Sequence, residues 1–345
     1  MQYVFAMGGW DGVACHSDIA VYSPDGAPSS HMAPRARNMQ SPRDALASAV
    51  VEHEVLALGG HDGSNYLASC EIYTASTPGA GRFTSWTLLP AMGTTRAFHG
   101  AGAIRRKVYA FGGQGSQSGP PGAYGAGGPP RSASVISSLE VLDLEGGIWT
   151  DGPALPSQRT MVAGVGSGQR VFCFGGRAGK FEEGEVLSSA LALDPRTRRW
   201  EELPAMSVKR YGAGAMALDN SIYVVGGKDG TVPLSLVEVF DQVKGAWRES
   251  PSMAHERAFP CVVSMGSFMY VIAGSNRTNE VDEVEEWSPI SSKWRIIRQH
   301  KVQENVEEMK QTKAHILKSL HSFIPSFIAN QGTHSQVFVS LNPKP

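Results

Sequence analysis

RAFHGAGAIRRKVYAFGG, at residues 96–113, is the stretch that decides the fold. Two short apolar runs flank the polar pair Arg105 and Arg106, and the second run ends at Gly112 and Gly113. Runs of this length, bounded by turn residues and glycine, are typical of β-strands rather than helices. The stretch therefore predicts two neighbouring strands joined by a tight turn. The glycine pair predicts a strand end where the backbone needs a positive φ or is closely approached by a neighbour.

The same apolar strand ending in two glycines recurs along the chain. The second glycines are Gly9, Gly60, Gly113, Gly176, Gly227 and Gly274, and the sixth copy reads Ala-Gly instead of Gly-Gly. Successive copies are 51, 53, 63, 51 and 47 residues apart. A repeat of roughly 50 residues corresponds to one four-stranded blade of a β-propeller. Six copies therefore predict an all-β, six-bladed propeller.

Three further residue positions, which we call columns, recur with the same period as the glycines. A glutamate lies two positions before the aromatic residue or leucine that ends the next strand, at Glu71, Glu140, Glu238 and Glu285. A tryptophan follows, at Trp86, Trp149, Trp200, Trp247 and Trp294. An arginine lies four residues after a Met or Leu, at Arg43, Arg96, Arg159, Arg210 and Arg257. The tryptophans predict large apolar plates between blades, and the small residues after each arginine predict inner strands that approach closely.

Together these columns resemble kelch repeats. The Gly-Gly pair, the Glu-x-Tyr strand, the later tryptophan and the Met-x-x-x-Arg junction carry the resemblance, and residues 59–73 and 96–113 look most like the propellers of BTB-kelch (kelch-like) proteins. The resemblance covers about residues 1–297. It implies a six-bladed kelch propeller. It also implies that partner peptides dock on the face formed by the loops between strands 2 and 3 and between strands 4 and 1.

Residues 1–297 are predicted to form the propeller, in which the first repeat lacks its innermost strand because Met1 lies two residues before the second strand. In the tail, residues 298–345, we expect a short amphipathic helix at 302–323 and a candidate ring-closing strand at 336–341. Two interpretations stay open: the tail closes the ring, which removes exposed edges, or the chain is incomplete. Fourteen of the 21 residues at 114–134 are Gly, Pro or Ser, which predicts a surface insertion.

Composition argues against several classes of protein. The formal net charge is −1, so the basic excess of a nucleic-acid-binding protein is missing. No signal peptide and no apolar run long enough to span a membrane is predicted. The cysteines, which are Cys15, Cys70, Cys173 and Cys261, are far apart and predict reduced thiols in the cytoplasm, with the nucleus as a second location. The ten histidines are scattered, so no metal or cofactor is predicted, and a metal site would have to be assembled across blades.

The five junction arginines have two interpretations. In one they brace the blade junctions by hydrogen-bonding to carbonyl groups, and in the other some of them line one mouth of the central channel. The resemblance to kelch-like propellers implies a docking mouth, where arginine and aromatic side chains are typical of binding hot spots. Mapped by column, the candidate partner-binding residues are Arg43, Arg96, Phe98, Arg159, Arg210, Tyr211, Arg257, Phe259, Trp10, Asp11, His61, Asp62, Tyr66, Arg177, Lys228, Asp229 and Arg277. An arginine-lined mouth would favour an acidic peptide segment.

Protein binding is the predicted function, and no catalytic residue is assigned. The acidic run at 282–286 is predicted to be solvated charge rather than an acid–base pair. The resemblance implies a substrate-recognition subunit or adaptor of a ubiquitin ligase, which would reach a cullin through another chain because no BTB or BACK domain fits here. The alternatives are a cytoskeletal, actin-binding protein and a kelch-fold enzyme that acts on a carbohydrate or another small molecule.

Overall fold

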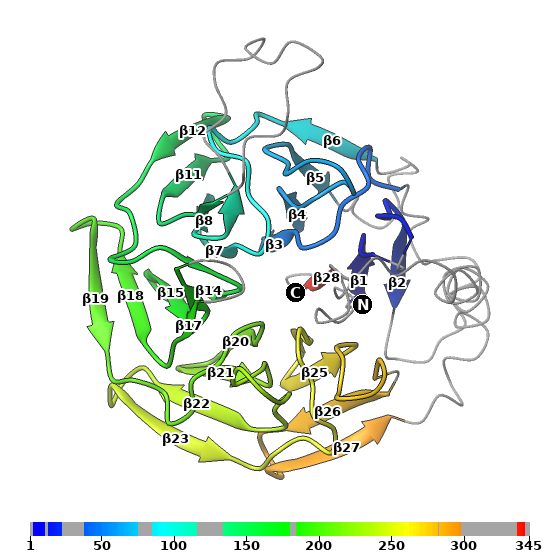
Figure 1. Cartoon of the computed structure of the whole chain (residues 1–345), viewed down its shortest axis with the longest axis vertical. Coiled ribbons are helices and arrows are strands. Elements are labelled where there is room, and N and C mark those ends of the chain that lie inside the picture. Colours follow the sequence, from blue (N-terminus) through cyan, green and yellow to red (C-terminus); the bar gives the residue numbers. More distant parts are fainter. Residues whose placement is uncertain are drawn as a thin grey trace.

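Six antiparallel sheets surround a central axis in the computed structural model of the chain (Figure 1). The structure describes residues 3–10, 13–22, 38–74, 85–115, 134–179, 184–281, 283–297 and 337–341. The regular elements within these ranges are all strands, and none of the described segments is a helix that could cross a membrane. Each of the six sheets is one blade, so the predicted all-β, six-bladed propeller is confirmed.

Five blades have four strands each, and the strands follow one another from the axis outwards in chain order. The second blade contains β3 (Ala47–Val51), β4 (Glu54–Leu58), β5 (Cys70–Thr74) and β6 (Trp86–Leu89). The third contains β7 (Gly100–Ile104), β8 (Lys107–Phe111), β11 (Leu139–Asp143) and β12 (Ile148–Asp151). The fourth contains β14 (Ala163–Ser167), β15 (Arg170–Phe174), β18 (Ala190–Asp194) and β19 (Arg199–Leu203). The fifth contains β20 (Gly214–Leu218), β21 (Ser221–Val225), β22 (Val237–Asp241) and β23 (Ala246–Ser250). The sixth contains β24 (Cys261–Met265), β25 (Phe268–Ile272), β26 (Val284–Ser288) and β27 (Lys293–Ile297).

The first blade combines the two ends of the chain. Its strands are β1 (Tyr3–Met7), β2 (Ile19–Tyr22) and β28 (Val337–Leu341). β28 pairs antiparallel with β1, from Tyr3 opposite Leu341 to Met7 opposite Val337, and it also lies against β3 and β24. It therefore takes the innermost position of the first blade, at the segment that the sequence offered as a ring-closing strand. The predicted helix at 302–323 lies outside the described residues.

Short ladders extend the blades at the end where strands 2 and 3 are joined. One consists of β9 (Gln114–Gly115) and β10 (Ser134–Val135), and another of β13 (Arg159–Thr160), β16 (Arg177–Ala178) and β17 (Glu185–Val186). Single bridges replace them in other blades, such as Tyr211 with Lys228. The predicted insertion at 114–134 starts and ends in the β9–β10 ladder, and its residues 116–133 lie outside the described part.

The inner strands approach one another as closely as their small residues allow. A Cβ atom on Gly166 would lie 2.0 Å from the carbonyl oxygen of Ala103, and a Cβ atom on Gly102 would lie 2.7 Å from the nitrogen of Gly166. Real side chains do not tolerate such distances, so β7 and β14 can meet only because both positions are glycine. The glycines that follow Arg96 and Arg159 therefore set how closely the third and fourth blades approach each other at the channel.

Residues that recur in each repeat form hydrogen bonds between one blade and the next. Gly113, at the end of β8, has a φ of +95° and donates its N–H to the carbonyl oxygen of Arg159 at 2.8 Å. On the outer side, Trp200 donates from Nε1 to the carbonyl oxygen of Pro153 at 2.9 Å. The same bond links Trp149 to Pro90, Trp247 to Pro204 and Trp294 to Pro251. These four tryptophans therefore join blades by hydrogen bonds as well as by packing, whereas Nε1 of Trp86 has no hydrogen-bond partner among the described residues.

Candidate docking site at the channel mouth

Arg96 lies inside the propeller rather than at its surface. Its side chain is fully buried, and Nη2 donates to Oε1 of Glu140 at 2.8 Å. Nη1 donates to the carbonyl oxygens of Gly112 and Ser138 at 3.1 and 2.9 Å. Its backbone bonds to the preceding blade, where the Gly60 N–H donates to the Arg96 carbonyl at 2.7 Å. The residue therefore ties one blade to the next.

The other junction arginines are buried in the same way. Three more of them pair with the glutamate column, namely Arg43 with Glu71, Arg210 with Glu238 and Arg257 with Glu285. Arg159 differs because Leu191 stands in the glutamate column, and it donates to the Gly175 carbonyl and to the hydroxyls of Ser157 and Ser189. All five are at most 4% exposed. The structure therefore shows the bracing interpretation and corrects the expectation of an arginine-lined mouth.

The acidic run in the sixth blade is also part of this internal framework. Glu285 is fully buried against Arg257, whose pKa is lowered by burial and held up by the charge of Glu285. Glu286 is 4% exposed, accepts a hydrogen bond from the Tyr270 hydroxyl at 2.8 Å and pairs with Arg295. The prediction of solvated charge is therefore wrong for these two glutamates, because each has a buried polar partner, Arg257 in one case and Tyr270 in the other.

The residues two positions after each junction arginine form the rim of the channel. These five, which we call the mouth collar, have φ between +47° and +58° and are Ala45, Phe98, Met161, Gly212 and Phe259. From Phe98 onwards to Phe259, each collar N–H donates to the carbonyl of the collar residue in the preceding blade, at distances of 2.7 to 2.9 Å. A chain of hydrogen bonds therefore runs around the mouth and fixes the direction of the collar side chains.

Aromatic side chains gather on this collar. Phe98 and Phe259 are partly exposed and have φ of +54° and +53°, a conformation that costs a residue with a Cβ about 1 kcal/mol. They pack with Met161 and Tyr211, and the rings of Tyr211 and Phe259 meet edge to face with centroids 6.2 Å apart. The guanidinium of Arg177 lies 4.7 Å from the centroid of the Tyr211 ring. Two bulky rings are thus held where glycine would fit with least strain.

The two aspartates among the candidates cap their own turns. Oδ1 of Asp62 accepts the N–H groups of Ser64 and Asn65 at 2.8 and 2.7 Å, and Asp229 does the same in the fifth blade. Burial alone would raise the pKa of Asp62, but these backbone bonds outweigh it and lower the pKa. Both aspartates therefore shape the loops between strands 2 and 3, and their bonded oxygens face the chain itself.

The remaining candidates are spread around the collar. Arg277 is exposed and makes two hydrogen bonds of 3.0 Å to Glu256, and the hydroxyl of Tyr66 donates to Gln114 at 3.2 Å. Half-buried side chains are those of Trp10, His61, Arg177 and Lys228. Asp11 lies outside the described residues. Of the predicted set, the structure therefore gathers Phe98, Tyr211, Phe259 and Arg177 at one place.

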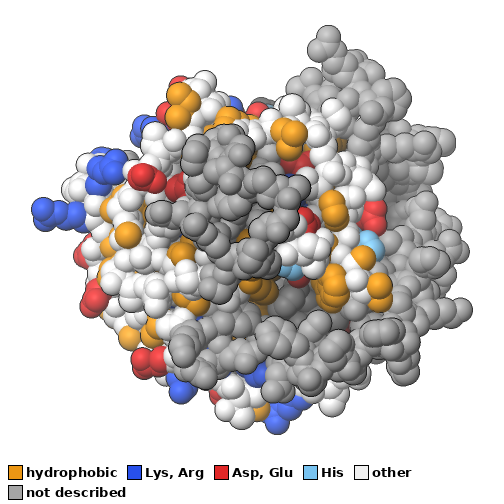
Figure 2. Space-filling model, turned by 45° about the horizontal axis from the view of Figure 1, so that its top comes forward, with side chains coloured by type: hydrophobic (Ala, Val, Ile, Leu, Met, Phe, Trp, Pro, Cys, Tyr) orange, Lys and Arg blue, Asp and Glu red, His pale blue; other side chains and the backbone are white. Residues whose placement is uncertain are grey.

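The collar leads into a central cavity of about 450 Å³, which is lined by the inner strands. Its described walls consist mainly of Gly, Ala and Val, and the titratable side chains among them are His99 and Cys261. On the surface seen in Figure 2, most Lys and Arg side chains lie near the outline, whereas hydrophobic side chains reach further inwards. The described lining of the cavity is therefore mainly apolar, and Arg177 lies beside the aromatic cluster of the collar.

A family model described as the KLHDC2/KLHL20/DRC7 Kelch-repeats domain matches residues 120–319. The chain belongs to the kelch-repeat family. Its kelch repeats are 32% identical to Kelch-like protein 34 of Homo sapiens over 162 residues, which are 46% of this chain and 22% of that protein. They are 26% identical to alpha-scruin of Limulus polyphemus over 192 residues, 55% of this chain and 19% of that protein. Kelch domain-containing protein 8B of Homo sapiens is 32% identical over 147 residues, 41% of this chain and 38% of that protein. The kelch chain thus matches well under half the length of each of these relatives.

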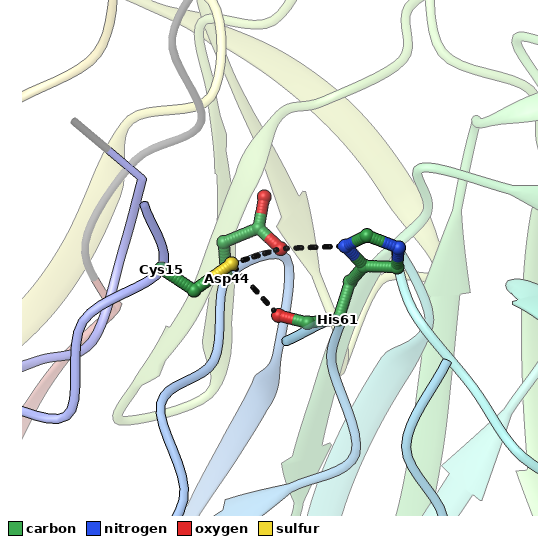
Figure 3. Close-up of side chains that lie close together, drawn as sticks. All are labelled: Cys15, Asp44 and His61. Atoms are coloured by element: carbon green, nitrogen blue, oxygen red, sulfur yellow. Dashed lines mark hydrogen bonds and ion pairs between the residues drawn. The ribbon is translucent and has the colours of Figure 1, made fainter. Parts of the chain in front are cut away.

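The kelch propeller also brings together Cys15, Asp44 and His61, which no sequence motif links (Figure 3). Sγ of Cys15, in the first blade, lies 3.7 Å from Oδ1 of Asp44 and 3.1 Å from the carbonyl oxygen of His61. Nδ1 of His61 lies 3.8 Å from Oδ1 of Asp44. Burial, and then the charge of Asp44, raises the pKa of the Cys15 thiol to about 12, so this thiol is not an activated nucleophile. The cluster is a set of metal-ligand types without any local sequence motif.

Proposed function

We propose that this kelch propeller is a protein-interaction module that holds a segment of a partner protein at the channel mouth. The observation that carries the proposal is the pair Phe98 and Phe259, two partly exposed aromatic residues in a left-handed conformation. Strained residues of this kind cluster at ligand-binding sites, and aromatic anchors are enriched among binding hot spots. The kelch-repeat relatives support a protein-interaction role for the fold.

The chemistry of the collar favours a segment with an apolar anchor beside an acidic residue. The anchor would pack on Phe98, Met161 and Phe259, which already form an apolar cluster. Positive charge next to this cluster comes from Arg177, above the Tyr211 ring, and from Lys228, whose backbone bridges to Tyr211. An acidic peptide therefore remains our proposed partner, with Arg177 and Lys228 in place of the five buried arginines.

The identity of the partner decides between the finer roles. A substrate-recognition subunit or adaptor of a ubiquitin ligase would hold a substrate here while another chain connects it to a cullin, whereas a cytoskeletal protein would hold actin. We place either role in the cytoplasm or nucleus, because none of the cysteines, all of which lie in the described part, forms a disulfide. An enzyme of small-molecule metabolism would instead need an acid–base pair, and the described cavity walls contain no carboxylate.

Replacing Phe98 and Phe259 together by glycine is expected to release the partner while keeping the fold. Gly212 already occupies the same collar position in the fifth blade, so glycine fits the left-handed backbone without strain. Loss of one aromatic hot spot weakens binding by about 2 kcal/mol, roughly 30-fold in Kd. The measurement is quantitative mass spectrometry of proteins captured by the wild-type and variant chains, followed by titration of the purified partner.

Val243 and Ile290 supply the matched control. Both are exposed hydrophobic residues in turns between strands 3 and 4, at the opposite end of the blades from the collar. Their joint replacement by alanine removes apolar surface of similar character, and we expect the partner to be retained. Equal capture by the collar variant and the wild type would show that the partner, if there is one, docks elsewhere and would refute the proposal.

A further inference from the structure

The Cys15–Asp44–His61 cluster occupies a position that recurs at every described blade junction. Asp44 and His61 form a backbone bridge in the second blade, and Cys15 bridges to Trp10 in the first. The corresponding bridges elsewhere place one residue of the preceding blade beside two residues of the next. These equivalent sets are Tyr66 with Ala97 and Gln114, Val135 with Thr160 and Arg177, Val186 with Tyr211 and Lys228, and Pro233 with Ala258 and Ser275.

Among these described junctions, the first alone carries three side chains that ligate soft divalent metals. The repeat fixes the positions, so the proximity of the three side chains follows from the fold. The residue types do not follow from the fold, because the other junctions use apolar, hydroxyl, amide or cationic side chains at the same places. A thiol, a carboxylate and an imidazole have therefore been placed where the propeller requires none of them.

The distances between the ligand atoms fit a tetrahedral metal ion. Zinc bonds of ordinary length to sulfur, nitrogen and oxygen place the ligand atoms about 3.3–3.6 Å apart. The observed separations from Oδ1 of Asp44 are 3.7 Å to Sγ of Cys15 and 3.8 Å to Nδ1 of His61, and all three atoms lie within 4.8 Å of one another. The two separations from Asp44 therefore exceed the expected range by only a few tenths of an ångström.

The negative charge at the cluster also favours a bound metal ion. The Asp44 side chain is 8% exposed. Besides its own backbone N–H, the described groups near its carboxylate are the Cys15 thiol at 3.7 Å and Nδ1 of His61 at 3.8 Å. Asp62 adds a second negative charge nearby. A divalent cation would compensate the charge of this buried carboxylate, which one thiol donor does not, because Nδ1 of His61 accepts the Gly63 N–H. It would replace the hydrogen bond that Gly63 donates to Nδ1 of His61 at 3.1 Å, which lies at the exposed edge of the cluster.

We infer that Cys15, Asp44 and His61 form a site for a thiophilic divalent cation of the zinc type, which links the first blade to the second. Coordination replaces the proton of the Cys15 thiol, which leaves to solvent, and a water completes the tetrahedron. Mixed sulfur, nitrogen and carboxylate donors select zinc or cobalt over magnesium and calcium. Because the three ligands come from two blades, metal bound there would stabilise the junction between the first and second blades.

Titration of the tag-free, metal-free chain with cobalt(II) tests this inference. We expect one equivalent to produce a near-ultraviolet thiolate-to-cobalt absorption band that added zinc abolishes. Cys15→Ser should remove the band, and His61→Gln should weaken binding at least about tenfold, since even outer-shell changes cost about 10–100-fold. Cys261→Ser, which removes another half-buried thiol, is the matched control and should leave the band unchanged.

Thermal unfolding separates loss of the site from loss of the fold. Without metal, Cys15→Ser and His61→Gln should melt close to the wild-type temperature, because a serine hydroxyl can also donate to the His61 carbonyl and the bond from Gly63 to His61 lies at the exposed edge. Zinc, but not magnesium, should raise the melting temperature of the wild type and of Cys261→Ser alone. Absence of a thiolate band at one equivalent, or equal binding by wild type and Cys15→Ser, would overturn the inference. Neither result depends on the docking mouth.

Discussion

Arg96→Met is expected to lower the free energy of unfolding by about 3–5 kcal/mol, because it breaks a buried ion pair and leaves one charge without its partner. Glu140 is 3% exposed and would keep only the N–H groups of Gly93 and Thr94, at 2.5 and 3.1 Å. The carbonyl groups of Gly112 and Ser138 would lose their shared donor. Chemical denaturation followed by tryptophan fluorescence measures the loss.

The fourth blade contains the matched control for this prediction. Arg159 occupies the same junction position, but Leu191 replaces the glutamate that Glu140 provides in the third blade. Arg159→Met therefore leaves carbonyl and hydroxyl groups without their donor, but it leaves no buried carboxylate without a partner. We expect a smaller loss, about 1–3 kcal/mol. A second test is Arg96→Met with Glu140→Leu, which reproduces in the third blade the Met and Leu pair of the Arg159→Met variant.

That double variant should recover part of the loss, with a coupling of about 1–3 kcal/mol. Similar losses for Arg96→Met and Arg159→Met, with additive effects of the two substitutions, would show that the ion pair does not control the junction.

The fold was predictable because every blade repeats the same local requirements. The glycine pair, the tryptophan and the small residues of the inner strand each meet a geometric requirement, such as the φ of +95° at Gly113 or the lack of room for a Cβ atom at Gly166. A structural requirement that recurs from blade to blade produces a periodic pattern in the sequence. The first blade is different, because β28 comes from the far end of the chain and carries no trace of the arginine column.

The role of the arginines was harder to predict, because recurrence is equally compatible with bracing and with a ring of binding residues. A signal was present in the glutamate column. Arg43, Arg96, Arg210 and Arg257 each have a column glutamate in the strand that follows, and the structure pairs all four. Considering the two columns together would have predicted buried ion pairs, since unpaired charge is rarely buried.

The docking surface and the metal-ligand cluster depend on contacts between neighbouring repeats, which periodicity does not encode. Cys15, Asp44 and His61 are 29 and 17 residues apart, so no spacing rule for metal ligands applies to them. The collar residues Phe98 and Phe259 were found from their column, but their left-handed backbone becomes visible only in the structure. Aligning the residues on either side of each junction would have exposed both features.

Acidification from pH 7 to pH 4 should destabilise the propeller by about 3 kcal/mol through one residue, His99. This side chain is 5% exposed, and neither ring nitrogen has a hydrogen-bond partner among the described residues. Burial, reinforced by the charge of Arg96, lowers the pKa of His99 from 6.5 to about 3. Because the unfolded chain takes up the proton first, stability is complete above about pH 6.5 and falls as the pH drops towards 3.

His99→Leu should remove this pH dependence without harming the fold. The column that contains His99 holds Leu46 in the second blade and Val162 in the fourth, so an apolar side chain suits the position. At pH 7 the variant should be as stable as the wild type or up to about 1 kcal/mol more stable, since it removes a buried polar ring without a partner. Carboxylates with lowered pKa values, such as Asp62 and Asp229, lose stability in acid equally in both proteins, so the difference between the two denaturation series isolates His99. Curves that stay parallel from pH 7 to pH 4 would mean that the imidazole is protonated in the folded state and has found an acceptor there.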